Sequence, residues 1–433
     1  MAETKDKGIS RRDLLKGAAA VTGAAVGSGV ITGFPTVWAQ NIKDVTITRI
    51  GSIYTTNPTV AAQANKDLGF KVDMQTLDQT TQFNRMLTQP ETVDIADFGN
   101  TAMGYFKGKG LLMAIPVKEY KWWDKTVPLF TQGTYPNGKP YSMQGYAPIK
   151  SQFWKDATAQ EYSPTPTDWL VGTPVMYNAD TLGIRPDLIK RPITSWKELL
   201  NSEFTGKVAL QDGVGVGVPD AACALEANGD LKYIDKGNMT RDEIDATINK
   251  LIEYKQAGQF RSFWTDFDQS VQLMASGEVV LQSMFAPAVT EVRTRGIPCT
   301  FQGLKEGYRG WYIFMSAMAH LDTGDKLRRD CAMEYINWCN SGFNGVYFSR
   351  QGFYSSVPDV IKPLMSANDY GYWYEGKAAT ADIVDPFGKV MEHAGAKRDG
   401  GSLWDRMGNV GIWNTLMDED RYLNKRWQEF ISA

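Results

Sequence analysis

The chain has 433 residues, of which 43% are hydrophobic and 22% charged, so its composition excludes disordered, collagen-like and coiled-coil classes. It has 46 Lys and Arg against 49 Asp and Glu, a net charge of -3 without long basic runs, which argues against a nucleic-acid partner. Only two histidines are present, His320 and His393, which leaves little material for a His-rich metal site or a catalytic relay.

Residues 1–39 have the features of an export signal that is removed from the mature protein. Arg11 and Arg12 precede a weakly apolar, Ala- and Gly-rich stretch over residues 17–31, an order typical of a twin-arginine signal. Small residues predict cleavage between Ala39 and Gln40. The stretch is too short and too rich in glycine for a membrane anchor, so we expect a periplasmic protein.

From residue 44 onward, short strands alternate with helices, which is the pattern of an α/β fold. Alternating apolar and polar residues predict a strand over 45–50, and helical spacing follows over 59–68. Further strands are predicted at 71–74 and 93–98, with a helix around Met86 between them. This part of the chain therefore predicts a sheet built from strand–helix units.

Residues 116–165 are rich in Tyr, Trp, Pro and Gly and have weak periodicity. A stretch of that length without regular structure, inside a compact domain, is more often a functional loop than a linker. We therefore expect a functional loop here.

The second half of the chain continues the alternation of strands and helices. Ser195, followed three residues later by Glu198, predicts a capping box at the start of a short helix. Buried strands are predicted at 207–211 and 278–282, an amphipathic helix at 242–256, a further helix at 323–340, and packed helices over 402–430. No internal sequence repeat is visible.

The four cysteines do not form a disulfide pattern. Cys331 and Cys339 are eight residues apart in a predicted helix, which places their Cα atoms about 12 Å apart, beyond bridging distance. Cys223 and Cys299 could pair only if the tertiary structure brought them together. We expect all four to act as small buried hydrophobic residues.

Residues 194–199 and 204–210, read together as TSWKEL and FTGKVAL, resemble a segment of bacterial extracellular solute-binding proteins, in particular the spermidine/putrescine-binding branch. Shorter pieces follow in the order that this family shows, over a total span of about 44–375. They are the strand at 93–98, Met176-Tyr177-Asn178, Gly277-Glu278-Val279, Arg309-Gly310-Trp311 and Gln351-Gly352-Phe353.

The resemblance implies a two-lobed periplasmic-binding-protein fold of type II, in which each lobe is a mixed sheet flanked by helices and a hinge joins the lobes. It implies a first lobe of residues 44–173 and 313–358 and a second lobe of residues 174–312 and 359–433. The chain would cross between them near 172–174, 312–314 and 357–358. Such proteins close around a solute and hand it to the permease of an ABC importer.

Two turns that follow predicted strands are candidate ligand-binding segments, because ligands of open α/β sheets lie beyond the carboxyl ends of strands. The first contains Asn100 and Thr101. The second begins with Asp212 and Gly213, continues through Gly215, and has Pro219 placed for a first helical turn. Free N–H groups at helix starts attract carboxylate or phosphate oxygens. The alternative is that the glycines only permit a tight turn.

The resemblance also implies an aromatic cleft. Six aromatic residues fall on or beside positions that the polyamine-binding branch uses to line its cleft, and aromatic faces stabilise organic cations. They are Tyr54, Phe285, Trp311, Phe353, Tyr354 and Trp373. Trp311 is the strongest of these candidates. For the others, burial in the core of a lobe is an equally simple interpretation.

The chain departs from the polyamine-binding branch at its acidic positions. Gly213, Val216 and Ile313 stand where that branch has carboxylates that hold ammonium groups. A buried ammonium without a carboxylate is costly, so the sequence favours a quaternary or zwitterionic amine or an opine-like amino-acid derivative over a linear polyamine. The alternative is a small organic anion held by Arg309 and the helix starts. Arg309 could equally be a solvated residue beside the hinge.

The motifs of common hydrolases, metalloproteases and nucleotide-binding enzymes are absent from the sequence, so we expect a binding protein and not an enzyme. We expect no cofactor and no metal. A monomer suits a protein that must dock onto a permease through both lobes.

Overall fold

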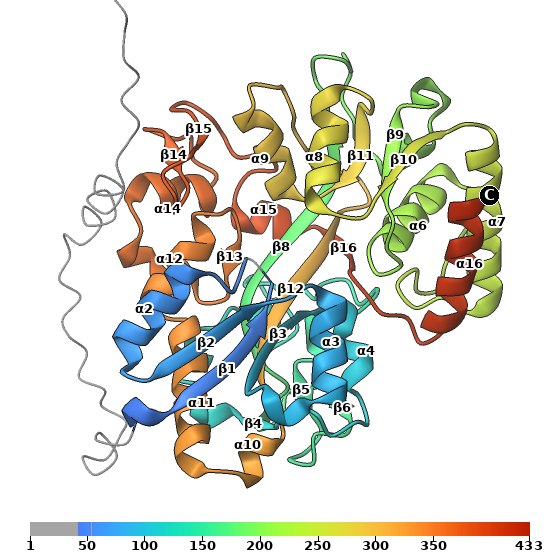
Figure 1. The fold of residues 1–433 in the computed structure, drawn as a ribbon. Helices are drawn as coiled ribbons and strands as arrows, with labels where there is room; N and C mark the ends of the chain where they lie inside the picture. Colours follow the sequence, from blue (N-terminus) through green and yellow to red (C-terminus); the bar gives the residue numbers. More distant parts are fainter. Residues whose placement is uncertain (1–41, 53) are drawn as a thin grey trace, which may run out of the picture.

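The computed structural model describes residues 42–52 and 54–433, and a ten-stranded sheet runs through the whole molecule (Figure 1). Its main path, in spatial order, is β10 (Phe260–Trp264), β9 (Val208–Gln211), β11 (Leu281–Met284), β8 (Thr173–Ile184), β12 (Tyr308–Ala317), β3 (Ile95–Gly99), β1 (Thr46–Gly51) and β2 (Lys71–Thr76). Off this path, β13 (Tyr354–Ser355) pairs with β8, and β16 (Val410–Trp413) pairs with β12.

Two long central strands join the two ends of this sheet. β8 and β12 pair in antiparallel register from Arg309 opposite Asp180 to Met315 opposite Thr173. Beyond this stretch, β8 continues into pairing with β11, whereas β12 pairs along its second half with β3. The result is the two-lobed α/β architecture that the sequence predicts, with β8 and β12 as the strands that run from one lobe into the other (Figure 1).

In the first lobe, β1 pairs in parallel with both β2 and β3, and helices pack around these strands (Figure 1). These helices are α2 (Pro58–Leu68), α3 (Gln79–Thr88), α4 (Met103–Phe106), α10 (His320–Thr323), α11 (Lys326–Cys339) and α12 (Gly342–Ser349), and α13 (Pro358–Ile361) packs against α12. α2 begins where predicted because the Asn57 side chain accepts a hydrogen bond from the N–H of Val60 and Pro58 occupies the first turn. Gly69, at φ 75°, ends it.

In the second lobe, β9 pairs in parallel with β10 and β11. A separate hydrophobic core lies beneath three of the helices of this lobe, whereas its other helices pack on the core that continues into the first lobe. The helices here are α6 (Gly217–Asn228), α7 (Arg241–Gln256), α8 (Phe267–Ser276), α9 (Ala286–Thr294), α14 (Ala367–Trp373), α15 (Leu403–Met407) and α16 (Asp420–Ser432). A complete capping box between Thr240 and Glu243 starts α7, which confirms the amphipathic helix predicted over 242–256.

The aromatic-rich segment predicted as a functional loop has structure of its own. It contains α5 (Pro128–Thr131), a 3-10 turn η6 (Pro148–Lys150) and a four-stranded antiparallel sheet. The strands are β4 (Ile115–Pro116), β7 (Trp169–Leu170), β5 (Phe153–Trp154) and β6 (Tyr162–Ser163). Many of its aromatic side chains, such as Phe130 and Trp154, are fully buried, so packing explains much of the aromatic content.

Two predicted helical regions differ in the structure. The region 402–430 contains the strand β16 between α15 and α16, because Val410–Trp413 extend the sheet along β12. The predicted capping box at Ser195 does not form, because the Glu198 carboxylate binds Arg191 instead, at 2.7 Å. The Ser195 hydroxyl caps only a 3-10 turn, η7 (Trp196–Leu200), and also donates to Glu306 at 2.6 Å.

All four cysteines are buried as free thiols, in agreement with their predicted role as small hydrophobic residues. Within the described residues, none of the helices is both long enough and apolar enough to cross a membrane. The proposed export signal and its cleavage position lie outside the described residues.

Candidate functional site

A cavity of about 570 Å³ lies between the two lobes and is lined by residues from both. The first lobe contributes the carboxyl ends of β1, β2 and β3 and the start of α3. The second contributes the end of β9 and the starts of α8 and α9, and β12 crosses between them. The volume lies within the usual range for small-molecule sites, and strand ends are where α/β sheets bind ligands.

The first-lobe side of the cavity, here called the polar wall, carries hydroxyl, amide and carboxyl groups. Because β1, β2 and β3 are parallel, the residues that follow all three strands meet at one edge of the sheet. The polar wall comprises Ser52, Thr55, Thr76, Asp78, Gln79, Gln82, Asp97, Asn100 and Thr101.

Asp97 is the buried carboxylate of the polar wall. Its Oδ2 accepts a hydrogen bond from the Thr55 hydroxyl at 2.8 Å, and its Oδ1 lies 3.3 Å from Arg49 Nη2. Burial raises the pKa of Asp97 above its ordinary value, although the charge of Arg49 and the Thr55 hydroxyl act in the opposite direction. Since Arg49 is itself fully buried, the pair adds little net charge to the cavity.

Asp78 is the second acidic residue of the polar wall and lies on its exposed rim. It caps α3, where its side chain accepts hydrogen bonds from the backbone N–H and the hydroxyl of Thr81. These hydrogen bonds lower the pKa of Asp78, so this carboxylate stays ionised at neutral pH.

A second part of the lining, here called the aromatic wall, is a row of rings in edge-to-face contact. Phe353 lies 5.7 Å from both Tyr54 and Trp311, measured between ring centroids, and Tyr54 lies 6.2 Å from Phe267. Phe285 also lines the cavity beside this row. The contact between Tyr54 and Phe267 joins the first lobe to α8 of the second, so the row closes one side of the cavity.

Two amide side chains present unsatisfied polar atoms at the cavity, one from each lobe. Asn100 Nδ2 and Gln211 Oε1 are buried without a hydrogen-bond partner, and both residues line the cavity. A buried polar atom without a partner is unfavourable, so both atoms are candidate contacts for a bound ligand.

The structure brings six of the twelve predicted site residues to the cavity. They are Tyr54, Asn100, Thr101, Phe285, Trp311 and Phe353. Trp311 projects from β12 and its Nε1 donates to Asp180 at 2.6 Å, which fixes the orientation of the indole. The other six lie away from the cavity lining.

Arg309 lies behind the aromatic wall and is fully buried. Its Nε donates to Asp220 at 2.7 Å, its Nη1 donates to Asn414 at 2.7 Å, and Asp180 lies 3.9 Å away. The guanidinium charge is therefore already balanced by carboxylates.

Tyr354 and Trp373 lie on the two sides of Arg398, whose Cζ is 4.7 Å and 4.4 Å from their ring centroids. Arg398 donates to the backbone carbonyl oxygens of Trp373 and Gly352, at 3.1 Å and 3.0 Å. Both aromatic residues therefore hold this buried cation as part of the core beside α14.

Most of the second-lobe turn also lies outside the cavity, and only Val216 within it and the preceding Gln211 line the cavity. Gln211, the last residue of β9, faces the cavity, whereas Asp212 accepts a hydrogen bond from Trp427 Nε1 at 2.8 Å. Gly213 is likewise away from the lining. Gly215 packs against the first lobe, since a Cβ there would lie 2.7 Å from Thr101 Cγ2. Pro219 occupies the first turn of α6, as predicted.

Most residues of the cavity lining were not predicted as ligand contacts, and Asp97, Gln211 and Phe267 are three examples. Asp97 lies on a predicted strand, but a strand pattern alone does not reveal which end opens into a cleft. Gln211 directly precedes Asp212, which was predicted as a ligand contact. A prediction shifted by one residue along the strand would therefore have identified Gln211. Phe267 starts a helix, and no local signal distinguishes it from a core residue.

Asp78 and Asp97 are the only charged residues among the described residues that line the cavity, and neither Lys, Arg nor His is among them. Val216 and Ile313, two of the positions that depart from the polyamine-binding pattern, line it with apolar side chains. Over residues 42–52 and 54–433, no group of three or more His, Cys, Asp and Glu is arranged to hold a metal ion.

The profile of the bacterial extracellular solute-binding protein family matches residues 59–370. The chain belongs to this family. A twin-arginine translocation signal matches residues 8–28, so this solute-binding protein is exported and periplasmic, as predicted. Its family and fold are those of binding proteins for transport and not those of enzymes. No curated protein sequence matches it significantly.

Several solved structures share this fold. The solute-binding protein superposes on the spermidine/putrescine ABC transporter substrate-binding protein PotD from Streptococcus pneumoniae with a TM-score of 0.58 and 11% identity, covering 89% of this chain and 97% of that one. For the TpPotD lipoprotein of Treponema pallidum the TM-score is 0.59 and the identity 12%, and the superposition covers 89% of this chain and 99% of that one. For an ABC transporter substrate-binding protein from Bradyrhizobium japonicum the TM-score is 0.55 and the identity 14%, with 89% of this chain and 99% of that one covered. At these identities the likeness establishes the fold alone.

Proposed function

We propose that this protein is the substrate-binding component of an ABC importer and captures a small organic solute with a cationic group by closing its two lobes. The proposed ligand class comprises amines related to polyamines, quaternary or zwitterionic amines and opine-like amino-acid derivatives. The partner is the membrane permease of the importer, to which the protein docks as a monomer, and no nucleic acid takes part.

The observation that carries this proposal is the unequal composition of the cavity. Among the described residues that line it, the only charged ones, Asp78 and Asp97, are acidic, and eight are aromatic. A desolvated cation over an aromatic face gains about 2 kcal/mol. An anion would meet two carboxylates and no basic side chain, so the cavity favours a cation.

Within this class, the cavity favours a ligand with one compact cationic group. Asp97 is already paired with Arg49, and Asp78 lies on the rim, so several buried ammonium groups would lack separate carboxylate partners. A quaternary ammonium needs no directional hydrogen bond and fits an aromatic wall. The unpartnered Asn100 and Gln211 atoms can then bind a polar group at the other end of the ligand.

The alternative of an organic anion held by Arg309 has less support. Arg309 is bound to Asp220 and Asn414 behind the aromatic wall, and freeing it would leave buried carboxylates uncompensated. We therefore retain the anion only as an outcome of the binding experiment.

The proposed mechanism is closure of two lobes around the hinge strands β8 and β12. We propose residues 44–173 and 313–358 as one lobe and 174–312 and 359–433 as the other. A ligand that contacts both lobes stabilises the closed form by its differential affinity, and the strands that cross between lobes absorb the rotation.

A thermal-shift panel on the mature protein tests this proposal. Choline, glycine betaine, putrescine, spermidine, an opine and small dicarboxylates are each added in excess, and the melting temperature is compared with that of the free protein. We expect at least one cationic compound to raise it and the dicarboxylates to leave it unchanged. A shift only with dicarboxylates would overturn the proposed ligand class, and turnover of a bound compound would indicate an enzyme.

A further inference from the structure

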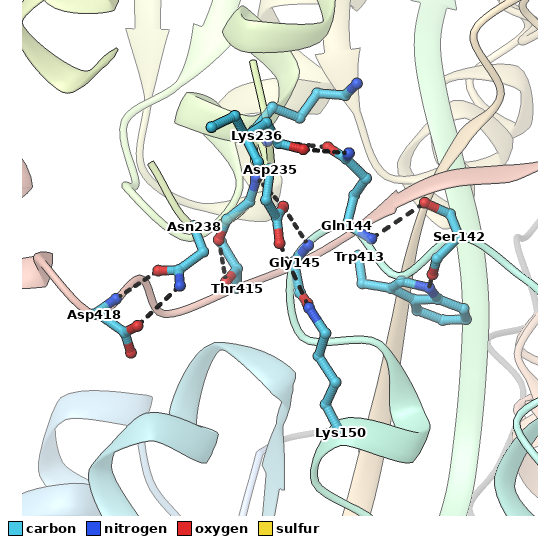
Figure 2. A network of polar contacts seen from close by, with 12 residues as sticks. Ser142, Gln144, Gly145, Lys150, Asp235, Lys236, Asn238, Trp413, Thr415 and Asp418 are labelled. Carbon is cyan, nitrogen blue, oxygen red and sulfur yellow. Dashed lines mark hydrogen bonds and ion pairs between the residues drawn. The ribbon is translucent and has the colours of Figure 1, made fainter. Parts of the chain in front are cut away.

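Away from the cavity, the segment 142–150 of the aromatic-rich insertion contacts the second lobe (Figure 2). The insertion itself is anchored to the first lobe. Trp122 Nε1 donates to the Asn337 carbonyl at 2.8 Å, and Gln152 Nε2 donates to the Gly172 carbonyl at 2.8 Å. Contacts made by this segment with the loop between α6 and α7 therefore join the two lobes.

Asp235, on the α6–α7 loop, makes the first of these contacts. Its Oδ1 accepts hydrogen bonds from the backbone N–H groups of Gly145 at 3.0 Å and Gly237 at 2.8 Å (Figure 2). Lys150 Nζ lies 3.5 Å from its Oδ2 and donates to the Gly145 carbonyl at 2.9 Å. The ion pair is partly exposed and contributes little, so the charge-assisted bond to Gly145 is the main link between the lobes here.

Gln144 makes the second contact with both ends of its side-chain amide. Its Nε2 donates to the Ile234 carbonyl at 3.2 Å, and its Oε1 accepts from the N–H of Lys236 at 2.9 Å (Figure 2). One side chain of the first lobe thus binds two peptide groups of the second.

The backbones approach so closely here that only glycine fits. A Cβ on Gly237 would lie 2.3 Å from Gly145 Cα, and a Cβ on Gly145 would lie 2.3 Å from the Trp413 carbonyl oxygen. The Trp413 N–H also donates to the Gln144 carbonyl at 3.1 Å. Trp413 directly precedes Asn414, which lines the cavity, so these contacts adjoin the ligand site without forming part of it.

We propose that Gln144 and Asp235 are positioning residues that hold the two lobes closed without touching the ligand. We call their contacts the clasp. This role rests on the lobe closure proposed above. The aromatic-rich insertion then has a function, because it supplies the first-lobe half of the clasp. Lobe closure is then set by the clasp as well as by the ligand.

Distance measurements on the ligand-free, full mature protein test the clasp independently of ligand identity. Cysteines are introduced for spin labels at Lys109 in the first lobe and Gln256 in the second, both exposed, while the four native cysteines remain buried. The clasp variant is Gln144→Ala with Asp235→Ala. In this variant, we expect about half or more of the molecules to change from the short distance between the two labels to a longer one. We expect its melting temperature to be unchanged.

The matched control is Asn238→Ala. Asn238 exchanges two hydrogen bonds with Asp418 beside the clasp, but both residues belong to the second-lobe segments next to α7 and α16 (Figure 2). We expect this variant to keep the parent distance. The proposal would be overturned by equal distances in the clasp variant and the parent, or by equal broadening in the control. A clasp variant that melts earlier is replaced by the single change Gln144→Ala, which removes both side-chain hydrogen bonds of Gln144 to the second lobe and whose expected effect has the same direction.

The distance measurement and the thermal-shift panel can fail independently of each other. If no compound shifts the melting temperature but the clasp variant opens, the ligand class is wrong and the clasp stands. If a cation binds and the distances do not change, the clasp is wrong and the ligand class stands.

Discussion

The two walls of the cavity are built by different means and serve recognition differently. The polar wall comes from residues that follow three parallel strands, so its groups meet through sheet topology. The aromatic wall is assembled from Tyr54, Phe267, Trp311 and Phe353, which come from distant parts of the chain. We therefore expect affinity for a cation to depend mainly on the aromatic wall, because Arg49 already balances the buried carboxylate of the polar wall.

Removal of the Trp311 ring should weaken cation binding by the aromatic wall. For Trp311→Ala, we expect about 30-fold weaker binding of the best cation in the panel, the equivalent of about 2 kcal/mol of lost cation–π stabilisation. Isothermal titration calorimetry measures this loss. Trp311→Phe is the matched control, since it keeps an aromatic face but removes the hydrogen bond to Asp180. Equal losses in both variants would contradict a role for the ring face.

Neutralisation of the buried carboxylate should break the polar wall. For Asp97→Asn, we expect about tenfold weaker cation binding, less than for Trp311→Ala because Arg49 offsets part of the charge. Binding is measured by the same calorimetry. Chemical denaturation is run in parallel, because the variant leaves Arg49 buried without its partner. Unchanged affinity in a stably folded variant would show that Asp97 does not contact the ligand electrostatically.

Acidification should weaken cation binding through protonation of Asp97 in the polar wall. Because burial raises the pKa of Asp97, the carboxylate is protonated at a higher pH than an exposed aspartate. Cation affinity should therefore fall as the pH drops through this raised value, and Asp97→Asn should lack that dependence. The folded chain binds this proton more tightly than the unfolded chain, so protonation of Asp97 does not itself unfold the protein. Affinity that rises on acidification would contradict the prediction.

Loss of the charge of Asp78, on the rim of the polar wall, should have the smallest effect on cation affinity. Asp78→Asn removes a charge while an amide oxygen can still cap α3, so we expect about twofold weaker binding, and only at low ionic strength. Titrations at low and high salt measure the difference. A loss that persists at high salt would place Asp78 in direct contact with the ligand.

Much of the fold could be predicted from the sequence because local signals coincide with real elements. Asn57 and Pro58 start α2, and the strands at 45–50 and 93–98 lie where their apolar patterns place them. The strand β16 was missed because Val410–Trp413 become a strand only through pairing with β12, a contact about 100 residues away in sequence.

The site was harder to predict than the fold. Trp311 and Phe353 were identified through a family resemblance, and they do line the cavity. Arg309 and Tyr354 are equally suggestive in sequence, but neighbours on other strands bury them behind the wall. Whether a side chain on a strand faces a cleft or a core depends on register and on the opposing lobe, and neither is encoded locally.

The central claim is that a cation is recognised by charge against aromatic rings and carboxylates. Its most direct test compares choline with 3,3-dimethylbutanol, an uncharged molecule of the same shape, by calorimetry on the mature protein. The account predicts that the quaternary ammonium binds at least about tenfold more tightly than its neutral isostere. Equal binding of the two, or tighter binding of the neutral compound, would contradict it.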